Sequence, residues 1–400
     1  MMSEQPAPQG TPLEVLAVFT RLGFTSFGGP VAHVGYFREE LVERRRWLDE
    51  ANFADLVALC QFLPGPASSQ IGIALGTARA GLLGGFMAWI GFTMPSALLM
   101  LSFALGLMAL GGDGTAGWLQ GFKVVAVAVV TQALWGMAKN LTPDALRGTL
   151  AISAAVLLLL WPAAWMQIVV LLLGGFAGWL WLKDGPQATQ ASTLAIHVPA
   201  PLSWASGLLL LLGLGALPLL VAVSNNHGLA LFDAFFRAGS LVFGGGHVVL
   251  PLLEQYVVAP GWVIRPEFIA GYGAAQAMPG PMLSFAAYLG AMSGPAPNGL
   301  LGASIALLGI FLPSFLLIWA SLPLWARLRS APSAQAVLRG INAAVVGILL
   351  AALYDPVMTS AIHSTFDVAL ALSAFAALHL WRVPAWALVL VAAAGGLLFG

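Results

Sequence analysis

Long apolar stretches recur along this chain, and they limit what it can fold into more than any other feature does. Residues 82–110 and 204–224 are two of them. Each is long enough to cross a bilayer as a helix, which takes about 20 residues. Charged residues make up 8% of the chain, against about 25% in soluble domains, so they are too few to cover a soluble surface. The sequence therefore predicts an all-α protein that crosses a membrane many times.

The polar residues exclude several classes of protein. The formal net charge is zero, which gives no reason to expect a nucleic-acid partner. Cys60 is the single cysteine, so an internal disulfide and a multi-cysteine metal site are both ruled out. We expect no cofactor and no metal. Residues 1–11 form a polar tail without the pattern of a cleaved signal peptide.

The chain contains an internal repeat, which divides it into two similar halves. At an offset of 216 residues, Phe19, Arg21, Gly23 and the Phe27-Gly28-Gly29 run return as Phe235, Arg237, Gly239 and Phe243-Gly244-Gly245. The PGP motif at 64–66 returns at 279–281, and Pro95-Ser96 returns as Pro313-Ser314. An ordered series of this kind predicts one repeat over 12–182 and a second over 228–400. Between them, residues 183–227 form a linker with one unpaired transmembrane helix at about 204–224.

The distribution of Lys and Arg predicts how the halves sit in the membrane. Basic residues near span ends mark the cytoplasmic side, and in the first half Arg38, Arg44–Arg46 and Arg79 surround two short segments. We interpret 52–79 as a re-entrant hairpin with Pro64–Pro66 at its tip, because neither arm is long enough to cross alone. The unpaired helix then places the second half in the inverted orientation. If the early segments cross fully, the inversion is the same but Arg38 and Arg44–Arg46 lie outside.

The remaining spans follow from the apolar pattern. We expect full membrane spans at about 82–110, 118–138, 146–161 and 165–182 in the first half, and at 300–325 and 337–353 in the second. Inverted repeats whose broken helices meet near the midplane are the architecture of secondary transporters. The predicted fold is therefore two inverted-topology repeats with broken or re-entrant helices, joined by one unpaired helix.

Four breaks interrupt these helices at Gly or Pro. Irregular backbone at membrane depth persists where it is buried in protein or lines a wet cavity. A helix that starts after such a break points its N–H groups at it, which favours an anion. The breaks predict a substrate site built from Gly28, Gly29, Pro30, Pro64, Gly65, Pro66, Gly244, Gly245, Gly246, Pro279, Gly280 and Pro281. Neighbouring side chains add polar groups, namely Gln61, Ser68, Ser69, Gln276 and Ser284. The alternative is that GG and PGP are only packing contacts or kinks.

Two arginines supply charge to this predicted site. Arg21 and Arg237 each precede their glycine pair within an apolar stretch. An arginine inside a membrane is costly, so it suggests a function. Two guanidinium groups with several N–H donors would suit a tetrahedral dianion. The alternative is that both arginines extend to an interface.

Other charged or titratable residues have two interpretations each. His33, His247 and Lys123 are candidates for a proton or gating role. The alternative is structural and is the more common one. In it the two histidines only fill space between helices, and Lys123 anchors its helix at the membrane interface. The run REELVERRRWLDE at 38–50 predicts a solvated amphipathic helix on the cytoplasmic surface, with gating ion pairs as the alternative.

The motifs together resemble the chromate ion transporter family, in its long two-domain form. The likeness rests on FGGP after an arginine-containing segment, QFLPGP and QAMPGP, and the later MPS and LPS, and it covers both halves. It implies two homologous halves of opposite orientation and export of chromate across the bacterial inner membrane, giving chromate resistance, with sulfate as a competing anion. It also implies functional roles for the motif residues, which include Phe27 and Phe243. The second half departs from the pattern with FGGG in place of FGGP.

We therefore expect a multi-pass inner-membrane secondary transporter whose partners are chromate or sulfate and the lipid bilayer. Assembly as a homodimer is compatible with this prediction. No Walker motif is present, so an ion gradient or the membrane potential would drive it. An inward permease for sulfate or another anion is the alternative. An intramembrane lipid enzyme is disfavoured, because the apolar segments hold only isolated candidates such as Asp55 and Glu267.

Overall fold

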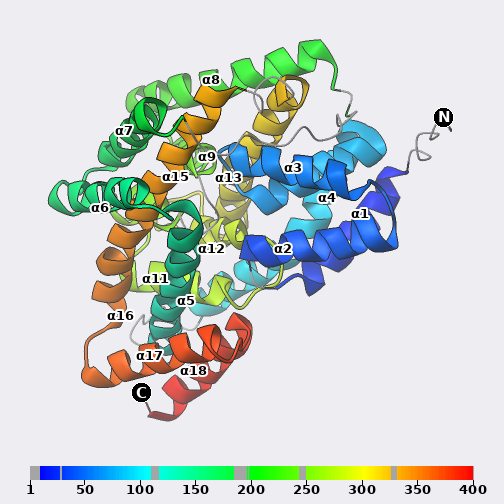
Figure 1. The fold of residues 1–400 in the computed structure, drawn as a ribbon. Coiled ribbons are helices and arrows are strands. Elements are labelled where there is room, and N and C mark those ends of the chain that lie inside the picture. Colours follow the sequence, from blue (N-terminus) through cyan, green and yellow to red (C-terminus); the bar gives the residue numbers. More distant parts are fainter. Residues whose placement is uncertain are drawn as a thin grey trace.

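The structure is a computed structural model, and it describes residues 10–27, 29–109, 117–183, 196, 198–242, 249–325 and 331–399. Every regular element in these ranges is helical, which confirms the predicted all-α fold (Figure 1). Five of the described helices are long and apolar enough to span a membrane, and several shorter apolar helices accompany them. The protein is therefore a polytopic, multi-pass membrane protein.

The elements of the first half begin near the N-terminus and end before the linker. In order they are α1 (Pro12–Thr25), α2 (Gly29–Phe37), the π-helix η1 (Arg38–Arg44), α3 (Glu50–Phe62), α4 (Ala67–Ala109), α5 (Gly117–Leu141), α6 (Ala145–Leu160) and α7 (Ala164–Trp181). The unpaired helix α8 (Ala200–Val223) follows. The observed helices match the predicted spans to within a few residues, except that α4 begins earlier than 82.

The second half repeats this order with more interruptions. Its elements are α9 (His227–Leu241), α10 (Val249–Leu253), the π-helix η3 (Glu254–Val258), α11 (Arg265–Ala275), the 3-10 turn η4 (Met282–Ser284), α12 (Phe285–Met292), α13 (Gly299–Ser321), η5 (Leu322–Leu324), α15 (Pro332–Ala352), the π-helix η6 (Leu353–Met358), α16 (Thr359–Ala361), α17 (Thr365–His379) and α18 (Ala385–Phe399). At the sequence offset of the repeat, α1, α3, α5, α6 and α7 correspond to α9, α11, α15, α17 and α18.

Local sequence signals set where several helices begin. Thr11 caps α1, with Pro12 in the first turn, and Asp49 caps α3 by accepting a hydrogen bond from the Asn52 N–H at 2.8 Å. Ser364 and Asp367 form a capping box at the start of α17. Each cap satisfies backbone N–H groups that would otherwise lack a partner.

The long helix α4 is two helices that meet at a break. Ala80 has φ −143° and ψ 29°, and Gly81 has φ +66°, so the helical ladder stops there. Glycine adopts a positive φ without steric cost. The arm over 67–79 is thus separate from the long membrane span that follows. Together with α3 it forms two short helices flanking the PGP loop. Whether this hairpin re-enters the membrane stays a prediction.

The two halves exchange their last helices. Helix α5 of the first half packs against α17 and α18 of the second, whereas α15 of the second half packs against α6 and α7 of the first (Figure 1). In the view of Figure 1, the teal helix α5 reaches the red pair α17 and α18, and the orange helix α15 runs beside the green helices. The halves are therefore interlocked, and neither completes its own bundle.

Glycines make the α7–α15 contact close. A Cβ atom placed on Gly340 would lie 1.9 Å from the carbonyl oxygen of Gly174, and one on Gly178 would lie 2.3 Å from the carbonyl oxygen of Ala336. Membrane helices approach each other this closely where small residues are spaced four apart. Gly174 and Gly178 have that spacing on α7, so the exchange of helices depends on them.

Candidate functional site

Each PGP loop contacts the helix break of the other half. The Gly65 N–H donates a hydrogen bond to the carbonyl oxygen of Val242, 2.5 Å away, and the Gly280 N–H donates to that of Ser26 at 2.8 Å. Ser26 and Val242 are the residues that end α1 and α9. Because Gly65 corresponds to Gly280 and Ser26 to Val242 in the repeat, the two contacts are reciprocal. We call these contacts the two crossings.

Both crossings require glycine at the tip of the loop. Gly65 has φ +119° and Gly280 has φ +86°, values that L side chains rarely adopt. A Cβ on Gly280 would lie 2.9 Å from the carbonyl oxygen of Phe92 and 3.1 Å from Ser96 Oγ. A Cβ on Gly65 would lie 2.4 Å from Gln70 Nε2 and 3.6 Å from Ser314 Oγ. Ser96 of the first half thus lies beside the Gly280 loop, and Ser314 of the second half lies beside the Gly65 loop. Each of these serines directly follows a proline.

Several buried hydroxyl groups near the crossings have no protein partner. In each of them the side-chain oxygen is shielded from solvent and forms no hydrogen bond with the described residues. They belong to Ser26, Ser69, Thr93 and Ser314. Most buried polar groups in proteins are hydrogen-bonded. Unpaired hydroxyls around two glycine loops can donate to a ligand with several acceptor oxygens.

The loop at 64–66 is also held from within its own half. The Gln70 side chain is fully buried, and its Nε2 donates to the carbonyl oxygen of Pro64 at 2.6 Å. Its Oε1 atom is buried without a partner. At the second loop, Gln276 Nε2 lies 3.1 Å from Met282 Sδ. Each loop thus has one amide side chain against it, although the two amides come from different positions.

The other predicted residues of the loops lie at varied depth. Ser68, Ser69 and Ser284 are buried. Pro66, Pro279 and Pro281 are also buried, whereas Pro30 and Pro64 are half-buried and Gln61 is exposed. Phe27 packs its ring 6.0 Å from that of Trp386 on α18, and Gly29 has φ +79°. Gly28, Phe243, Gly244, Gly245, Gly246 and His247 lie outside the described residues.

The two predicted arginines each contact a carboxylate of their own half. Arg21 is 59% exposed, and its Nη1 lies 4.0 Å from Glu40 Oε1. Arg237 forms an ion pair with Asp233, whose side chain is 1% exposed, and its guanidinium lies 4.9 Å from the Tyr256 ring centre. Glu40 and Tyr256 correspond in the repeat, so both arginines face the same position. Each arginine is thus paired within its own half, and the cradle shared by the two stays a prediction.

Three guanidinium groups surround Glu40 beside the C-terminal half of α1. Arg45 Nε donates to Oε1 at 2.7 Å and Arg44 Nη1 donates to Oε2 at 3.1 Å, with Arg21 beyond. Burial raises the pKa of Glu40, but the hydrogen bond from Arg45 and the charges of Arg44 and Arg21 outweigh it, so the pKa lies below its ordinary value. The carboxylate stays ionised, and the cluster carries a net positive charge. The prediction of one amphipathic helix over 38–50 was wrong in part, because Arg38–Arg44 form the π-helix η1 whereas residues 45–49 are not helical.

One ion pair recurs in both halves with its charges exchanged. Arg38 Nε donates to Glu50 Oε1 at 2.7 Å, and Arg265 Nη2 donates to Glu254 Oε1 at 2.7 Å. At the offset of the repeat, Glu254 stands where Arg38 stood and Arg265 where Glu50 stood. The geometry of the pair is thus kept while its polarity is reversed.

The remaining candidates are buried beside the crossings or on α5. His33 is 1% exposed, and its ring lies 5.3 Å from that of Phe92, the residue whose carbonyl oxygen lines the Gly280 loop. Lys123 is buried on α5, where Asp367 of the other half acts on it electrostatically. Within the described residues, no group of three His, Cys, Asp or Glu side chains is arranged to hold a metal ion. The site therefore has neutral hydroxyl groups without protein partners at its centre and basic groups at its margin.

Sequence reasoning missed Ser26, Gln70 and Thr93, because nothing in an apolar helix marks which polar side chain turns inward. Ser96 and Ser314 had a signal in the repeat, where the two Pro-Ser pairs align, but they were not placed at the loops. Asp233 had a signal as well, since it lies one turn before Arg237 on α9.

Comparison with known proteins gives one family. The sequence model of the family described as "Chromate transporter" matches residues 13–179 and again residues 229–397. The "Chromate transport protein" of Pseudomonas aeruginosa is 29% identical over 98% of this chain and 92% of its own length. The protein of the same description from Cupriavidus metallidurans is 28% identical over 93% of this chain and 88% of its own. No solved structure matches the chain.

Proposed function

Because this chain belongs to the chromate transporter family, we propose that it carries chromate across the membrane in which its helices lie. The relatives from Pseudomonas aeruginosa and Cupriavidus metallidurans, which it matches over most of their length, are chromate transport proteins, not enzymes. Chromate is a tetrahedral dianion with four acceptor oxygens, so it needs several donors arranged around it.

The pair of reciprocal crossings is the observation that carries this proposal. Each crossing combines a glycine loop, buried hydroxyl groups without partners, and a helix end. The donors at each crossing are the unpaired hydroxyl groups. Neutral donors bind an oxyanion without holding it too tightly to release, because they supply hydrogen bonds but no full charge. The basic groups around Glu40 would raise the local concentration of anions at the margin.

We further propose that the halves are inverted and work by alternating access, with export from the cytoplasm as the direction. The exchange of α17 and α18 for α6 and α7 supports a twofold relation between the halves. The basic run Arg44–Arg46 has no basic counterpart at 259–262 of the second half, which supports opposite orientation, because basic residues favour the cytoplasmic side. An ion gradient or the membrane potential would drive export across the inner membrane, with sulfate as a competing anion.

Transport of labelled chromate in membrane vesicles tests direction and substrate together. Everted vesicles that contain the protein should accumulate chromate faster than vesicles from cells with an empty vector, and excess sulfate should slow this uptake. Collapse of the ion gradients with an ionophore should abolish it. Equal uptake with and without the protein would contradict the transport role. Accumulation only in right-side-out vesicles would instead favour an inward permease.

A further inference from the structure

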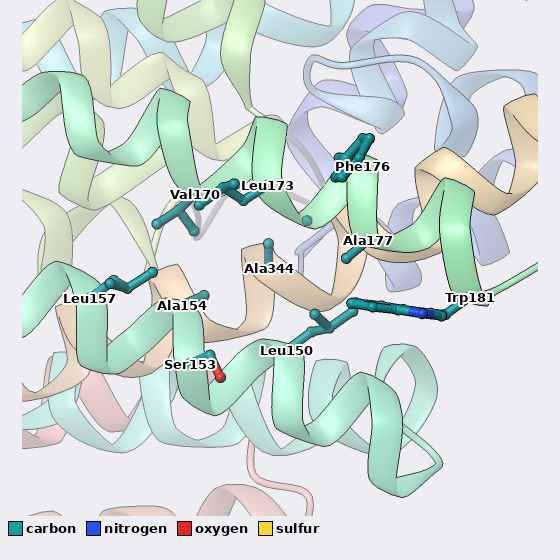
Figure 2. A pocket seen from close by; sticks show the side chains of 11 residues that line it. Leu150, Ser153, Ala154, Leu157, Val170, Leu173, Phe176, Ala177, Trp181 and Ala344 are labelled. Carbon is teal, nitrogen blue, oxygen red and sulfur yellow. The ribbon is translucent and has the colours of Figure 1, made fainter.

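An apolar groove of about 260 Å³ lies between α6 and α7, away from the two crossings. Figure 2 shows Leu150, Ser153, Ala154 and Leu157 on α6 facing Val170 and Ala177 on α7, with Ala344 of α15 between the two helices. Ser153 is exposed, and Phe176 and Trp181 on α7 are about half exposed or more. The groove therefore opens toward the surroundings of the helices and not toward the transport site.

The chemistry of the groove suits hydrocarbon. Apart from Ser153, its lining side chains are aliphatic, aromatic or glycine, so a polar solute would lose its hydration there without gaining hydrogen bonds. The groove lies on helices that we place in the membrane, where its outward side meets lipid. An acyl chain fills such a space at no desolvation cost, because it leaves an apolar environment for another.

One end of the groove is basic. Figure 2 shows Leu150 and Trp181 side by side at this end. Arg147 lies one turn before Leu150 on α6, and Lys183 follows two residues after Trp181. Arg339 of α15 donates two hydrogen bonds to the carbonyl oxygen of Leu182, at 3.0 and 2.6 Å. These bonds hold the end of α7 against α15. Among the described residues at this end, Asp144 is acidic, and it accepts a hydrogen bond from Arg147 at 2.6 Å.

The aromatic residues place this basic end at the membrane surface. Lys183 Nζ lies 4.6 Å from the ring centre of Trp179, and Trp179 and Trp181 are both exposed. Tryptophan is enriched where lipid headgroups meet the acyl chains, and basic residues next to it extend toward phosphate groups. The apolar groove and its basic end thus have the spacing of a lipid tail and its headgroup.

We propose that this groove binds an anionic phospholipid, with one acyl chain between α6 and α7 and the phosphate at Arg147 and Lys183. Arg339 acts through the backbone of α7, since its guanidinium is already bound to Leu182. Because α6 and α7 belong to the first half and α15 to the second, the lipid would fasten the exchanged helices together.

Lipid retention by the purified full-length protein, measured by native mass spectrometry, tests this site. We expect phosphatidylglycerol to bind the wild type more tightly than phosphatidylcholine and to saturate at about one molecule per chain. Arg147→Gln/Lys183→Gln should weaken phosphatidylglycerol binding by roughly 25-fold, from about fivefold for each basic residue. Arg46→Gln/Arg382→Gln removes two exposed basic residues outside the groove and should leave binding unchanged.

A second variant tests the apolar part independently. Ser153→Trp places an indole in the mouth of the groove without altering the buried faces of α6, so the protein should fold and lose the lipid. Equal binding of the two lipids by the wild type, or unchanged phosphatidylglycerol binding in both variants, would overturn the proposal. So would displacement of the lipid by millimolar inorganic phosphate, which would indicate a free-anion site. A wild-type dimer that Ser153→Trp dissociates would assign the groove to a contact between two chains.

Discussion

The Gly280 N–H donates to the carbonyl oxygen of Ser26, 2.8 Å away, although the two residues lie in different halves of the chain. This bond ties the tip of the second PGP loop to the end of α1. Its counterpart ties the first loop to the end of α9. A movement of either loop therefore acts on a helix end in the opposite half, which is the coupling that alternating access between two repeats requires.

Alanine at Gly280 should abolish chromate transport while the protein still inserts. Its Cβ would lie 2.9 Å from the backbone oxygen of Phe92, and alanine is strained at φ +86°. We expect at least a tenfold loss of uptake in everted vesicles, normalised to protein level. Gly261→Ala is the matched control, because Gly261 has φ +78° with no atom near its Cβ position. An equal loss in both variants would attribute the effect to backbone strain alone.

Alanine at Ser314 should weaken chromate binding without lowering stability. Its buried Oγ has no protein partner, so its removal costs no hydrogen bond in the protein. A bond from a hydroxyl to a charged ligand contributes about 1.5–3 kcal/mol, so we expect KM for chromate to rise by roughly tenfold or more.

Ser240→Ala is the control for this prediction. Ser240 Oγ is buried but donates to the carbonyl oxygen of Phe236 at 2.7 Å. We expect an unchanged KM in this variant. A lowered melting temperature with an unchanged KM in Ser314→Ala would show that this hydroxyl has a structural role only.

The carboxylate of Glu40 should make stability depend on pH in the acidic range. Its pKa in the folded protein lies below the ordinary value of 4.5, so its contribution is complete above that pH and is lost as pH falls through the folded pKa. Glu40→Gln should therefore lower the melting temperature at pH 7, and the difference from wild type should shrink below about pH 4.5.

Melting curves of the protein in lipid nanodiscs between pH 3.5 and 7 measure this difference. Glu39→Gln is the matched control, because Glu39 is exposed and forms no ion pair among those of the described residues. A difference between Glu40→Gln and wild type that stays constant over the whole range would refute the ion-pair explanation.

Exchange of the charges of Arg38 and Glu50 should be tolerated, because the second half already holds the pair in that polarity. Arg38→Glu alone places a carboxylate beside Glu43 and Glu50, and we expect it to destabilise the protein by up to about 1 kcal/mol. Arg38→Glu/Glu50→Arg should recover most of that loss. Thermal unfolding of the two variants and the wild type checks this, and a double variant no better than the single one would contradict it.

The sequence predicted the helices better than it predicted their partners. The apolar lengths placed α5, α6, α7, α8 and α13 to within a few residues, because membrane helices must satisfy their own backbone. The packing of α5 against α17 and α18 had no signal, since interhelical contacts between apolar faces depend on shape alone. The close approach at Gly174 and Gly178 was not predicted either, although their spacing of four residues on α7 is typical of such contacts.

The sequence predicted the loops of the candidate site but not all of the polar side chains around them. Repeated glycines and prolines pointed to the loops at Gly65 and Gly280, because a break in a membrane helix needs such residues. The buried serines and Gln70 could not be assigned, since a single polar side chain in an apolar run has no periodic signature. For Arg21, the sequence suggested a charged centre, and the described side chain is exposed and adjacent to Glu40.

The exchange of helices has a consequence for how the chain is made. A membrane protein is synthesised and inserted from its N-terminus onward, and its early parts usually fold first. Here α5 lacks two of its neighbours until α17 and α18, which come far later in the chain, have been inserted. The first half is therefore only partly assembled until these helices have been made. A premature stop before α17 would disturb the packing of α5, far from the missing residues in sequence.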